Sequence, residues 1–271
     1  MTRRIYDFVA GTYNSESGII AAKNRAALDM LARRFANRQE PLRVADLGVG
    51  DGALLERLAA LPLDMQATGL DLSPAMLEVA GRRVDIQPVV GSAERAAELL
   101  PGGSFDLLLA HFILAYVGRQ ALFEQVGRLL APGGIVSLVT STEEGAAPFY
   151  EALERHFTRT RNPLRRIIGR AARRALSHSS VPKGWPELQS DLEAAGLQVL
   201  ARQTLRIAVA FETADDAYRF CVYEGWAANF LAMPGVPLPV AKWLSRRGLQ
   251  ACDYPFRFTQ VIEIVEAGKR L

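Results

Sequence analysis

The stretch Val44-Ala45-Asp46-Leu47-Gly48-Val49-Gly50-Asp51-Gly52-Ala53 decides the fold. Its first four residues are typical of a buried strand, three glycines follow, and an apolar helical pattern begins directly afterwards over residues 54–61. Glycines at these positions allow a tight turn and let the loop backbone approach a ligand at the start of the helix. The stretch therefore predicts a strand, a glycine loop and a helix that together bind a nucleotide-like ligand.

The rest of the chain continues the alternation that this stretch begins. Short apolar runs typical of strands are separated by segments long enough for a helix, and this alternation predicts a parallel α/β sheet. The runs lie at residues 42–47, 66–70, 86–90, 105–110 and 134–140, and two further strands are expected at residues 197–211 and 256–266.

Helix signals agree with this spacing. Ser73 and Pro74 supply an N-cap and a first-turn proline for a helix over residues 76–84. Residues 21–35 place apolar side chains at helical spacing, and Lys23 is expected among the polar side chains between them. Further helices are expected at residues 120–130, ended by Pro132-Gly133-Gly134, at residues 185–195, ended by Gly196, and at residues 215–231.

Length and composition exclude several classes of protein. Of the 271 residues, 49% are hydrophobic and 23% are charged, which excludes disordered, collagen-like and coiled-coil chains. The longest uncharged apolar run, residues 107–117, is about half of the ~20 residues that a membrane span requires. Because no signal-like apolar segment follows the N-terminus, we expect a cytoplasmic protein without stable membrane insertion.

Cysteine and histidine usage does not predict a metal site. Cys221 and Cys252 are the only cysteines, and they form no CxxC motif. The three histidines lie far apart in the sequence, so no cluster has metal-ligand spacing. The net charge of +3 is mildly basic and by itself says little about partners.

Two acidic residues narrow the choice of ligand for the glycine loop. The spacing Gly48-x-Gly50-x-x-Ala53 fits a dinucleotide as well as S-adenosylmethionine. Asp46 would repel a pyrophosphate but would favour the ammonium and sulfonium groups of S-adenosylmethionine. Asp71 ends the second predicted strand, where an acid accepts hydrogen bonds from ribose hydroxyls. These residues therefore favour S-adenosylmethionine.

With these residues the sequence resembles the class I S-adenosylmethionine-dependent methyltransferases, over about residues 6–141. Residues 46–52 look like that family's first motif, and residues 69–77 are similar to its second. The resemblance implies an α/β fold with a Rossmann-like, mostly parallel seven-stranded sheet, helices on both faces, an antiparallel last strand and helical cap insertions. It implies S-adenosylmethionine as cofactor, S-adenosylhomocysteine as product, and no metal. The implied cofactor-binding residues are Tyr6, Tyr13, Asp46, Gly48, Gly50, Gly52, Asp71, Leu72, Met76, Ser92, Ala93, Glu94 and His111.

The resemblance also implies which part of the cofactor each motif contacts. The backbone of the first motif holds the methionine portion, Asp71 binds the ribose, and Leu72 and Met76 lie against the adenine. Residues 91–94 lie where the family reads the adenine amino group. The family often has Asp in place of Ser92, so a weaker side-chain contact or recognition by the backbone is implied.

The layout is similar to that of small-molecule and acyl-carrier methyltransferases with a helical insertion between the last two strands, such as the malonyl-carrier-protein type. Tyr6 and Tyr13 resemble the family's mobile N-terminal helix, which closes over the methionine end. The resemblance implies in-line methyl transfer without a metal, as O-methylation of a small molecule or a carrier-bound acyl group in biosynthesis. We expect a single methyltransferase domain over residues 1–271, with a helical lid at 1–40, a cofactor-binding core at 41–141, and substrate caps at 145–185 and 212–255.

His111, just past the fourth strand, is the candidate general base because its pKa lies near working pH. The alternative is that it only shapes the pocket or contacts the cofactor. Tyr116 and Glu143 are weaker candidates for the base. Several aromatic residues either line an apolar acceptor pocket or belong to the core, namely Phe149, Tyr150, Tyr218, Phe220, Tyr223, Trp226 and Phe230.

An arginine-rich helix is expected at residues 164–176, within a tract of arginines from Arg155 to Arg174. It either meets an acidic carrier protein, an anionic substrate, an anionic membrane surface or RNA, or it is a solvated face; among the functional alternatives, a carrier protein or an anionic substrate is favoured. A nucleic-acid (RNA) methyltransferase is a second hypothesis, but residues 110–113 lack the Asn/Asp-Pro-Pro-aromatic motif that base-modifying enzymes of this fold commonly have. A third is a non-catalytic protein that binds S-adenosylmethionine, which turnover measurements would distinguish.

Overall fold

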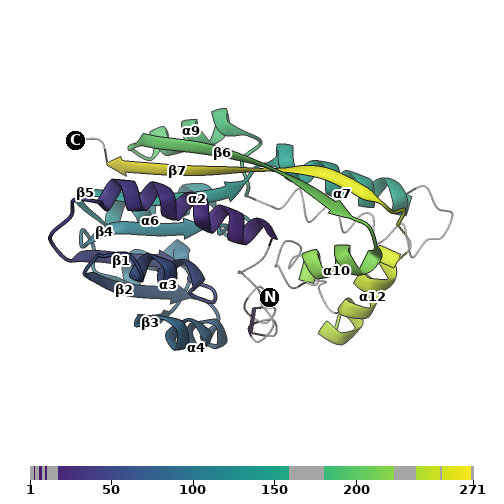
Figure 1. Ribbon diagram of the computed structural model, residues 1–271, viewed down its shortest axis with the longest axis horizontal. Coiled ribbons are helices and arrows are strands. Elements are labelled where there is room, and N and C mark those ends of the chain that lie inside the picture. The colour runs from purple at the N-terminus through teal and green to yellow at the C-terminus, as the bar shows by residue number, and fades with distance from the viewer. Residues whose placement is uncertain are drawn as a thin grey trace.

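The computed structural model describes residues 3, 6, 7, 10, 18–158, 180–222, 236–250 and 252–269, and it describes the backbone alone at residues 146, 149, 150, 152, 153, 156–158 and 222. Seven strands form one sheet with the order β3-β2-β1-β4-β5-β7-β6 (Figure 1). Neighbouring strands are parallel except at β7, which runs antiparallel to both β5 and β6. The predicted fold class is confirmed.

Most element bounds follow the sequence signals. Ser73 Oγ accepts a hydrogen bond from the N–H of Met76 and caps α4, whose first residue is Pro74. The strands are β1 (Leu42–Leu47), β2 (Met65–Asp71), β3 (Gln87–Val90), β4 (Phe105–His111), β5 (Leu130–Ser141), β6 (Leu197–Phe211) and β7 (Phe256–Lys269). The helices are α2 (Gly18–Phe35), α3 (Ala53–Ala59), α4 (Pro74–Arg83), η1 (Ala93–Arg95), α5 (Ala96–Leu99), α6 (Arg119–Leu129), α7 (Glu143–Thr158), α9 (Trp185–Ala194), α10 (Ala214–Val222) and α12 (Leu238–Gln250).

The stretch Pro132-Gly133-Gly134 does not end α6, and that prediction was wrong. The helix ends at Leu129 because Leu130 already has an extended backbone, with φ −62° and ψ 129°. The stretch belongs to β5, whose pairing with β4 shifts register between Phe105 and Leu107. Since proline has no N–H for the ladder, these residues form an irregular start of the strand instead.

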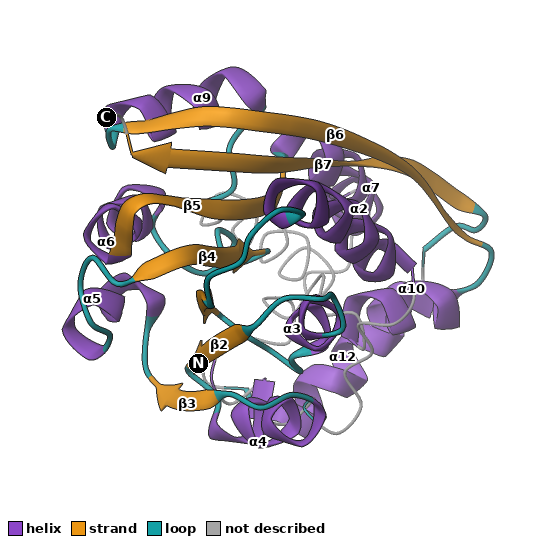
Figure 2. Ribbon diagram, turned by 60° about the vertical axis from the view of Figure 1, so that its left-hand side comes forward, coloured by secondary structure: helices purple, strands orange, loops and turns teal. Residues whose placement is uncertain are grey.

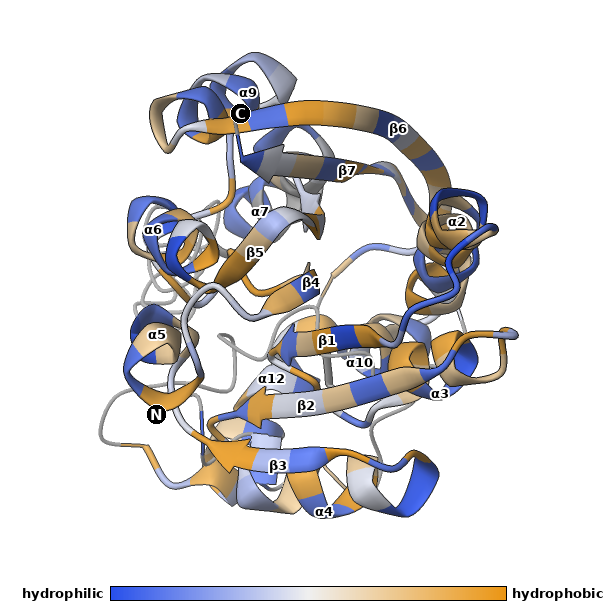
Figure 3. Cartoon of the chain, turned by 90° about the vertical axis from the view of Figure 1, so that its left-hand side faces the viewer, coloured by the Kyte–Doolittle hydropathy of each residue, from blue (hydrophilic) through white to orange (hydrophobic). Residues whose placement is uncertain are grey.

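Helices cover both faces of the sheet, and alternate strand residues face one layer or the other (Figure 2). In β1, Val44 packs with residues of α2, α3 and α4, whereas Ala45 packs with residues of α5, α6 and α9. The strands β4 and β5 lie between the two layers and are mostly hydrophobic (Figure 3). By the same alternation, Asp46, His111 and Ser137 lie on the face that α2 covers.

The last two strands extend beyond the core and carry the cap helices. β6 has 15 residues and β7 has 14, compared with 6 in β1. The cap helix α10 joins the far ends of these strands in one cluster, through aromatic contacts among Phe211, Phe220 and Phe258. In Figure 1, α10 and α12 lie beyond the carboxyl ends of the core strands, the edge at which ligands bind in such sheets.

The division into a lid at 1–40, a core at 41–141 and caps at 145–185 and 212–255 stays a prediction. Arg155 belongs to α7, but the expected basic helix at residues 164–176 lies outside the described residues. Within the described ranges, no helix has both the length and the apolar character that a membrane span requires.

Candidate cofactor and active site

The glycine loop between β1 and α3 has a backbone that glycine adopts readily and other residues do not. The φ angle is 100° at Gly48, 56° at Gly50 and 77° at Gly52, all in the left-handed region. A Cβ built on Gly52 would lie 3.0 Å from the Cα and Cβ of Ala80, so α3 also approaches α4 closely. A Cβ built on Gly50 would meet no described atom within 4 Å. The loop therefore presents bare backbone at the carboxyl end of β1.

Asp71 connects the end of β2 to this loop. Its Oδ2 accepts a hydrogen bond from the N–H of Gly50 at 3.0 Å, and its Oδ1 accepts one from the N–H of Ser73 at 2.8 Å. Burial raises the pKa of Asp71, although these two hydrogen bonds act in the opposite direction. A carboxylate oxygen accepts more than one hydrogen bond, so Asp71 retains capacity for ribose hydroxyls.

A buried acid and a buried base flank the end of β1. Burial raises the pKa of Asp46 to about 7, although the charge of Lys23 partly offsets this effect. Burial also lowers the pKa of Lys23 to about 8, although Asp46 and Asp51 act in the opposite direction. Among the described residues, Lys23 forms no ion pair within 4.0 Å of a carboxylate. Buried charges without a direct partner are costly, and such groups are typical of binding sites.

His111 ends β4 with both ring nitrogens engaged. Its Nδ1 lies 3.1 Å from Nζ of Lys23, and its Nε2 lies 3.0 Å from Oγ of Ser137. A lysine ammonium only donates, so Nδ1 accepts and Nε2 carries the proton. Burial, followed by the charge of Lys23, lowers the pKa of His111 well below 6.5. His111 is therefore neutral, and its acceptor nitrogen is occupied, so a role as general base requires Lys23 to move.

Lys23 is the residue that sequence reasoning missed. It was expected among the polar side chains of its helix, but its exposed fraction is 6%. Helix α2 packs on the sheet through a stripe that contains Ile20, Ala27 and Leu31, and Lys23 and Asn24 lie on that same stripe. Two polar residues on the apolar stripe of a helix were the signal that could have identified this position.

The residues expected near the adenine differ in their exposure. Leu72 is 38% exposed and offers an apolar surface directly after β2. Ser92 caps η1, and its Oγ accepts a hydrogen bond from the N–H of Glu94 at 3.3 Å. Ala93 and Met76 are buried, and Met76 packs against described residues of the N-terminal segment. Leu72 and the start of η1 can thus meet an adenine ring, whereas Met76 offers no free surface.

The described residues of the N-terminal segment lie against the same region. The ring of Tyr6 meets that of Tyr116 edge-on, with 5.7 Å between centroids. Asp7 accepts a hydrogen bond from Oγ of Ser73 at 2.6 Å. Burial raises the pKa of Tyr116, which makes it a poorer proton donor. The segment thus reaches from the start of α4 to the loop after β4, and Tyr13 lies outside the described residues.

The remaining candidates are Glu143 and the aromatic residues. Some of them lie among the described residues, and others lie outside them. Glu143 begins α7, and its N–H donates to the carbonyl of Pro182 at 2.9 Å. Phe220 is a core residue, and Tyr218 lies under the guanidinium of Arg246, 5.6 Å from the ring centroid. The side chains of Phe149 and Tyr150, and the whole of Tyr223, Trp226 and Phe230, lie outside the described part.

A comparison with models of known protein families finds a match that covers the segment containing the glycine loop. A family model described as "Methyltransferase domain" matches residues 44–134. The match runs from β1 into β5 and includes the glycine loop, Asp71 and His111. It does not include Lys23 or the cap helices.

Two of the curated relatives each match less than half of the chain. A trans-aconitate 2-methyltransferase of Methylobacterium nodulans is 38% identical over 117 residues, which are 43% of this chain and 44% of the relative. A ubiquinone biosynthesis O-methyltransferase of Azorhizobium caulinodans is 33% identical over 126 residues, 41% of this chain and 47% of the relative. The chain thus spans less than half the length of either relative.

A solved structure extends the likeness of fold to most of the chain. The YcgJ protein of Bacillus subtilis superimposes with a TM-score of 0.55 at 17% identity, covering 91% of this chain and 99% of that one. At this identity the likeness concerns the fold alone.

Proposed function

We propose that this chain, which belongs to the class I S-adenosylmethionine-dependent methyltransferases by its fold and its residues 44–134, transfers a methyl group to an oxygen of a small molecule or of a carrier-bound acyl substrate. One observation carries the proposal. The glycine loop lies between Asp46 and Asp71, two largely buried acids on the neighbouring parallel strands β1 and β2. This arrangement fits a ligand that combines an ammonium group with a ribose.

S-adenosylmethionine supplies a methyl group on a cationic sulfur, a leaving group that needs no Lewis acid. The residues of the chain supply position. Asp46 attracts the ammonium group, the bare backbone of the glycine loop lies along the methionine portion, and Asp71 accepts hydrogen bonds from the ribose. Catalysis then depends on a nucleophile held ~3 to 3.5 Å from the methyl carbon in a site from which water is excluded.

The nature of the acceptor is the finer part of the proposal. The relatives named for trans-aconitate and for O-methyl transfer support a small-molecule acceptor and an oxygen nucleophile. A carrier-bound acyl substrate and an acidic partner for residues 164–176 remain expectations from sequence layout, as does a cytoplasmic location. No feature of the described residues favours RNA, because β4 is followed by Phe112 and Ile113 without the motif of base-modifying enzymes.

Calorimetry with S-adenosylhomocysteine, S-adenosylmethionine and NAD tests the cofactor. The first two should bind and NAD should not. Replacing Asp71 by Ala should weaken binding of S-adenosylhomocysteine by ~1.5 to 3 kcal/mol, because charge-assisted hydrogen bonds are lost. Asp85→Ala, which removes an exposed acid before β3, is the matched control and should leave affinity unchanged. An unchanged affinity in Asp71→Ala would contradict the assignment.

Turnover is then measured with radiolabelled S-adenosylmethionine and a panel of carboxylic acids, phenols and acyl thioesters of carrier protein. Transfer to one of these classes identifies the acceptor, and binding without transfer to any of them would favour the non-catalytic alternative. In the described part of the chain, no three His, Cys, Asp or Glu side chains lie close enough together to hold a metal ion. Metal-independent transfer is part of the proposal, so a chelator should not lower the rate, and restoration of a lost rate by a divalent ion would contradict it.

A further inference from the structure

Two opposite charges beside the glycine loop lack direct partners. A lysine ammonium has three N–H groups to donate, and the one hydrogen-bond acceptor of Lys23 among the described residues is Nδ1 of His111 at 3.1 Å. The face of the Phe112 ring lies 5.3 Å from its Nζ. The side-chain carboxylate of Asp46 likewise receives no hydrogen bond from the described residues. Unsatisfied donors on a buried cation are costly, so this arrangement indicates that a ligand completes it.

The neighbouring side chains Asp51 and Asn24 do not supply the missing partners of Lys23 and Asp46. Asp51 faces Lys23 closely enough to influence its pKa, but Asp51 is paired with the guanidinium of Arg83 at 3.3 Å. Asn24, the next residue on α2, is 2% exposed, and its Oδ1 has no hydrogen-bond partner in the described part of the chain. A buried acid and a buried ammonium therefore lie near the carboxyl end of β1, and the residue that follows the lysine on α2 has a buried amide oxygen without a partner among the described residues.

The chemistry that fits this set is an α-amino acid zwitterion. Such a group carries an ammonium and a carboxylate on the same carbon, and it would place the ammonium toward Asp46 and the carboxylate toward Lys23. The methionine end of S-adenosylmethionine is a group of this kind. Lys23 meets this group only if the chain binds S-adenosylmethionine, as the proposed function states.

We propose that Lys23 is a positioning residue with two alternative partners: it donates to Nδ1 of His111 while the site lacks a carboxylate, and to the α-carboxylate of the cofactor once that is bound. In the second state Nδ1 of His111 becomes a free hydrogen-bond acceptor beside the methyl-transfer site. His111 thus acquires the capacity to act on the acceptor only after the cofactor has bound.

The electrostatics support this order. The charge of Lys23 is one of the causes that lower the pKa of His111, and a carboxylate bound to Lys23 neutralises that charge. A hydroxyl acceptor then gives its proton to Nδ1 as its oxygen bonds to the methyl carbon, while the electron pair of the broken carbon–sulfur bond stays on sulfur. The Nε2–H of His111 stays on Ser137 throughout, which keeps the ring in place.

Nitrogen-15 spectroscopy of histidine-labelled protein tests the switch without any acceptor, and His111→Gln assigns the signal. The probes are S-adenosylhomocysteine and 5′-methylthioadenosine, which has the same nucleoside and thioether but no amino acid group. S-adenosylhomocysteine should shift the Nδ1 signal of His111 as Lys23 leaves it, and 5′-methylthioadenosine should not. The same Nδ1 signal with both ligands would overturn the inference, whereas failure of S-adenosylhomocysteine to bind would overturn the proposed function itself.

Binding selectivity gives a second measurement. Lys23→Met should reduce the preference for S-adenosylhomocysteine over 5′-methylthioadenosine by about tenfold to a hundredfold, and Lys23→Arg should restore most of it. Arg33→Met is the matched control, because Arg33 is an exposed cation on the same helix, and its preference should equal that of the wild type. An unchanged preference in folded Lys23→Met, or a loss of preference in Arg33→Met, would contradict the role of Lys23. If Lys23→Met does not fold, the wild-type spectra and the Arg variant still decide.

Discussion

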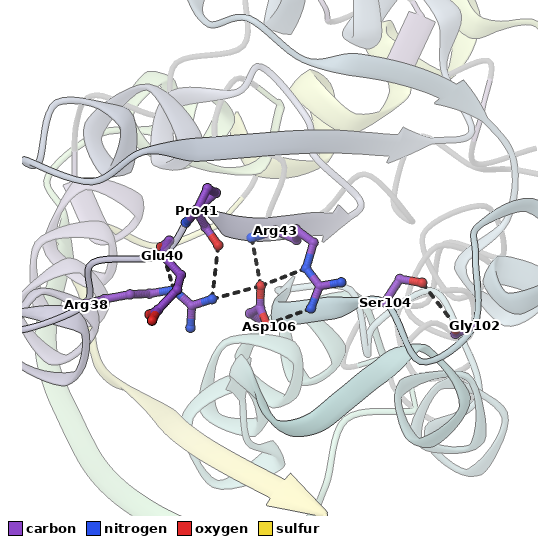
Figure 4. Close-up of polar contacts among 7 residues, drawn as sticks. All are labelled: Arg38, Glu40, Pro41, Arg43, Gly102, Ser104 and Asp106. Atoms are coloured by element: carbon purple, nitrogen blue, oxygen red, sulfur yellow. Dashed lines mark hydrogen bonds and ion pairs between the residues drawn. The ribbon is translucent and has the colours of Figure 1, made fainter.

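Acidic and basic side chains lie at both ends of β1 and β4, but they are paired with each other at one end and not at the other. At the amino ends, Asp106 accepts hydrogen bonds from the backbone and side chain of Arg43, each at 3.0 Å, and lies 3.1 Å from Arg38 (Figure 4). Partial burial acts to raise the pKa of Asp106, but these hydrogen bonds and charges hold it below its usual value. At the carboxyl ends, Asp46 and Lys23 are buried without such bonds, and their pKa values shift toward the neutral forms.

This difference fits a structural role for the cluster at the amino edge and the proposed binding role for the cluster at the carboxyl edge. A paired acid at the amino edge ties the end of α2 to two strands and gains from being charged. An unpaired acid at the carboxyl edge loses from being charged until a cation reaches it. The pKa of Asp46 is raised and that of Asp106 is lowered, so the two acids differ in the direction that the proposed binding role of one and the structural role of the other require.

The largest expected effect is on ligand affinity at one end alone. Asp46→Asn should weaken binding of S-adenosylhomocysteine by about tenfold to a hundredfold, because the ligand's ammonium loses a charged acceptor. Asp106→Asn makes the same chemical change at the other end and should leave the affinity within about twofold. Calorimetry of both variants measures this contrast, and equal losses would mean that the two ends do not differ in function.

A smaller effect is expected in the pH dependence of binding. Below pH 7, Asp46 takes up a proton, since burial raises its pKa to about 7, and the neutral acid no longer attracts an ammonium group. The affinity for S-adenosylhomocysteine should therefore fall as the pH falls from 7 to 5.5, by at most about tenfold per pH unit. In this range Lys23, whose pKa burial lowers to about 8, stays charged and does not oppose the trend. Asp46→Asn should show little change over this range, whereas Asp106→Asn should follow the wild type. If the affinity of the wild type did not change with pH, the charge of Asp46 would not contribute to binding.

The smallest effect concerns stability at the amino edge. Asp106→Asn should lower the free energy of unfolding by about 1 kcal/mol, since the carboxylate's hydrogen bonds with Arg43 are weakened. The folded pKa of Asp106 lies below 3.8, so its stabilising effect is present above that pH and is lost as the pH falls through the folded value. Urea unfolding at neutral and at acidic pH measures it. A difference between wild type and variant that persists in acid would show that the charge is not its cause.

Local signals were enough to predict much of the fold and part of the site. The bounds of β6, the cap of α4 by Ser73 and the glycine loop each depend on residues that are close together in the sequence, and each was found where expected. The contact between Lys23 and His111 joins residues 88 positions apart. The apolar stripe of α2 could have indicated that Lys23 is buried, but not that this part of the helix packs over the end of β4, which is a tertiary property. The contact of Met76 with the adenine stays a prediction; the spacing of α4 likewise did not indicate that Tyr6 and Ala10 pack against Met76.

The length of β6 and β7 affects which parts of the sequence can change without altering the central sheet. Residues 212–255, which include α10 and α12, connect the end of β6 to the start of β7. The flanking residues Phe211 and Phe256 pair with each other. The paired residues of the central strands and the glycine loop all lie outside this segment, although Phe220 and Leu249 pack with Ile19 of α2 in one cluster. The part expected to meet the acceptor can therefore be exchanged as a module while the donor-binding half is inherited unchanged.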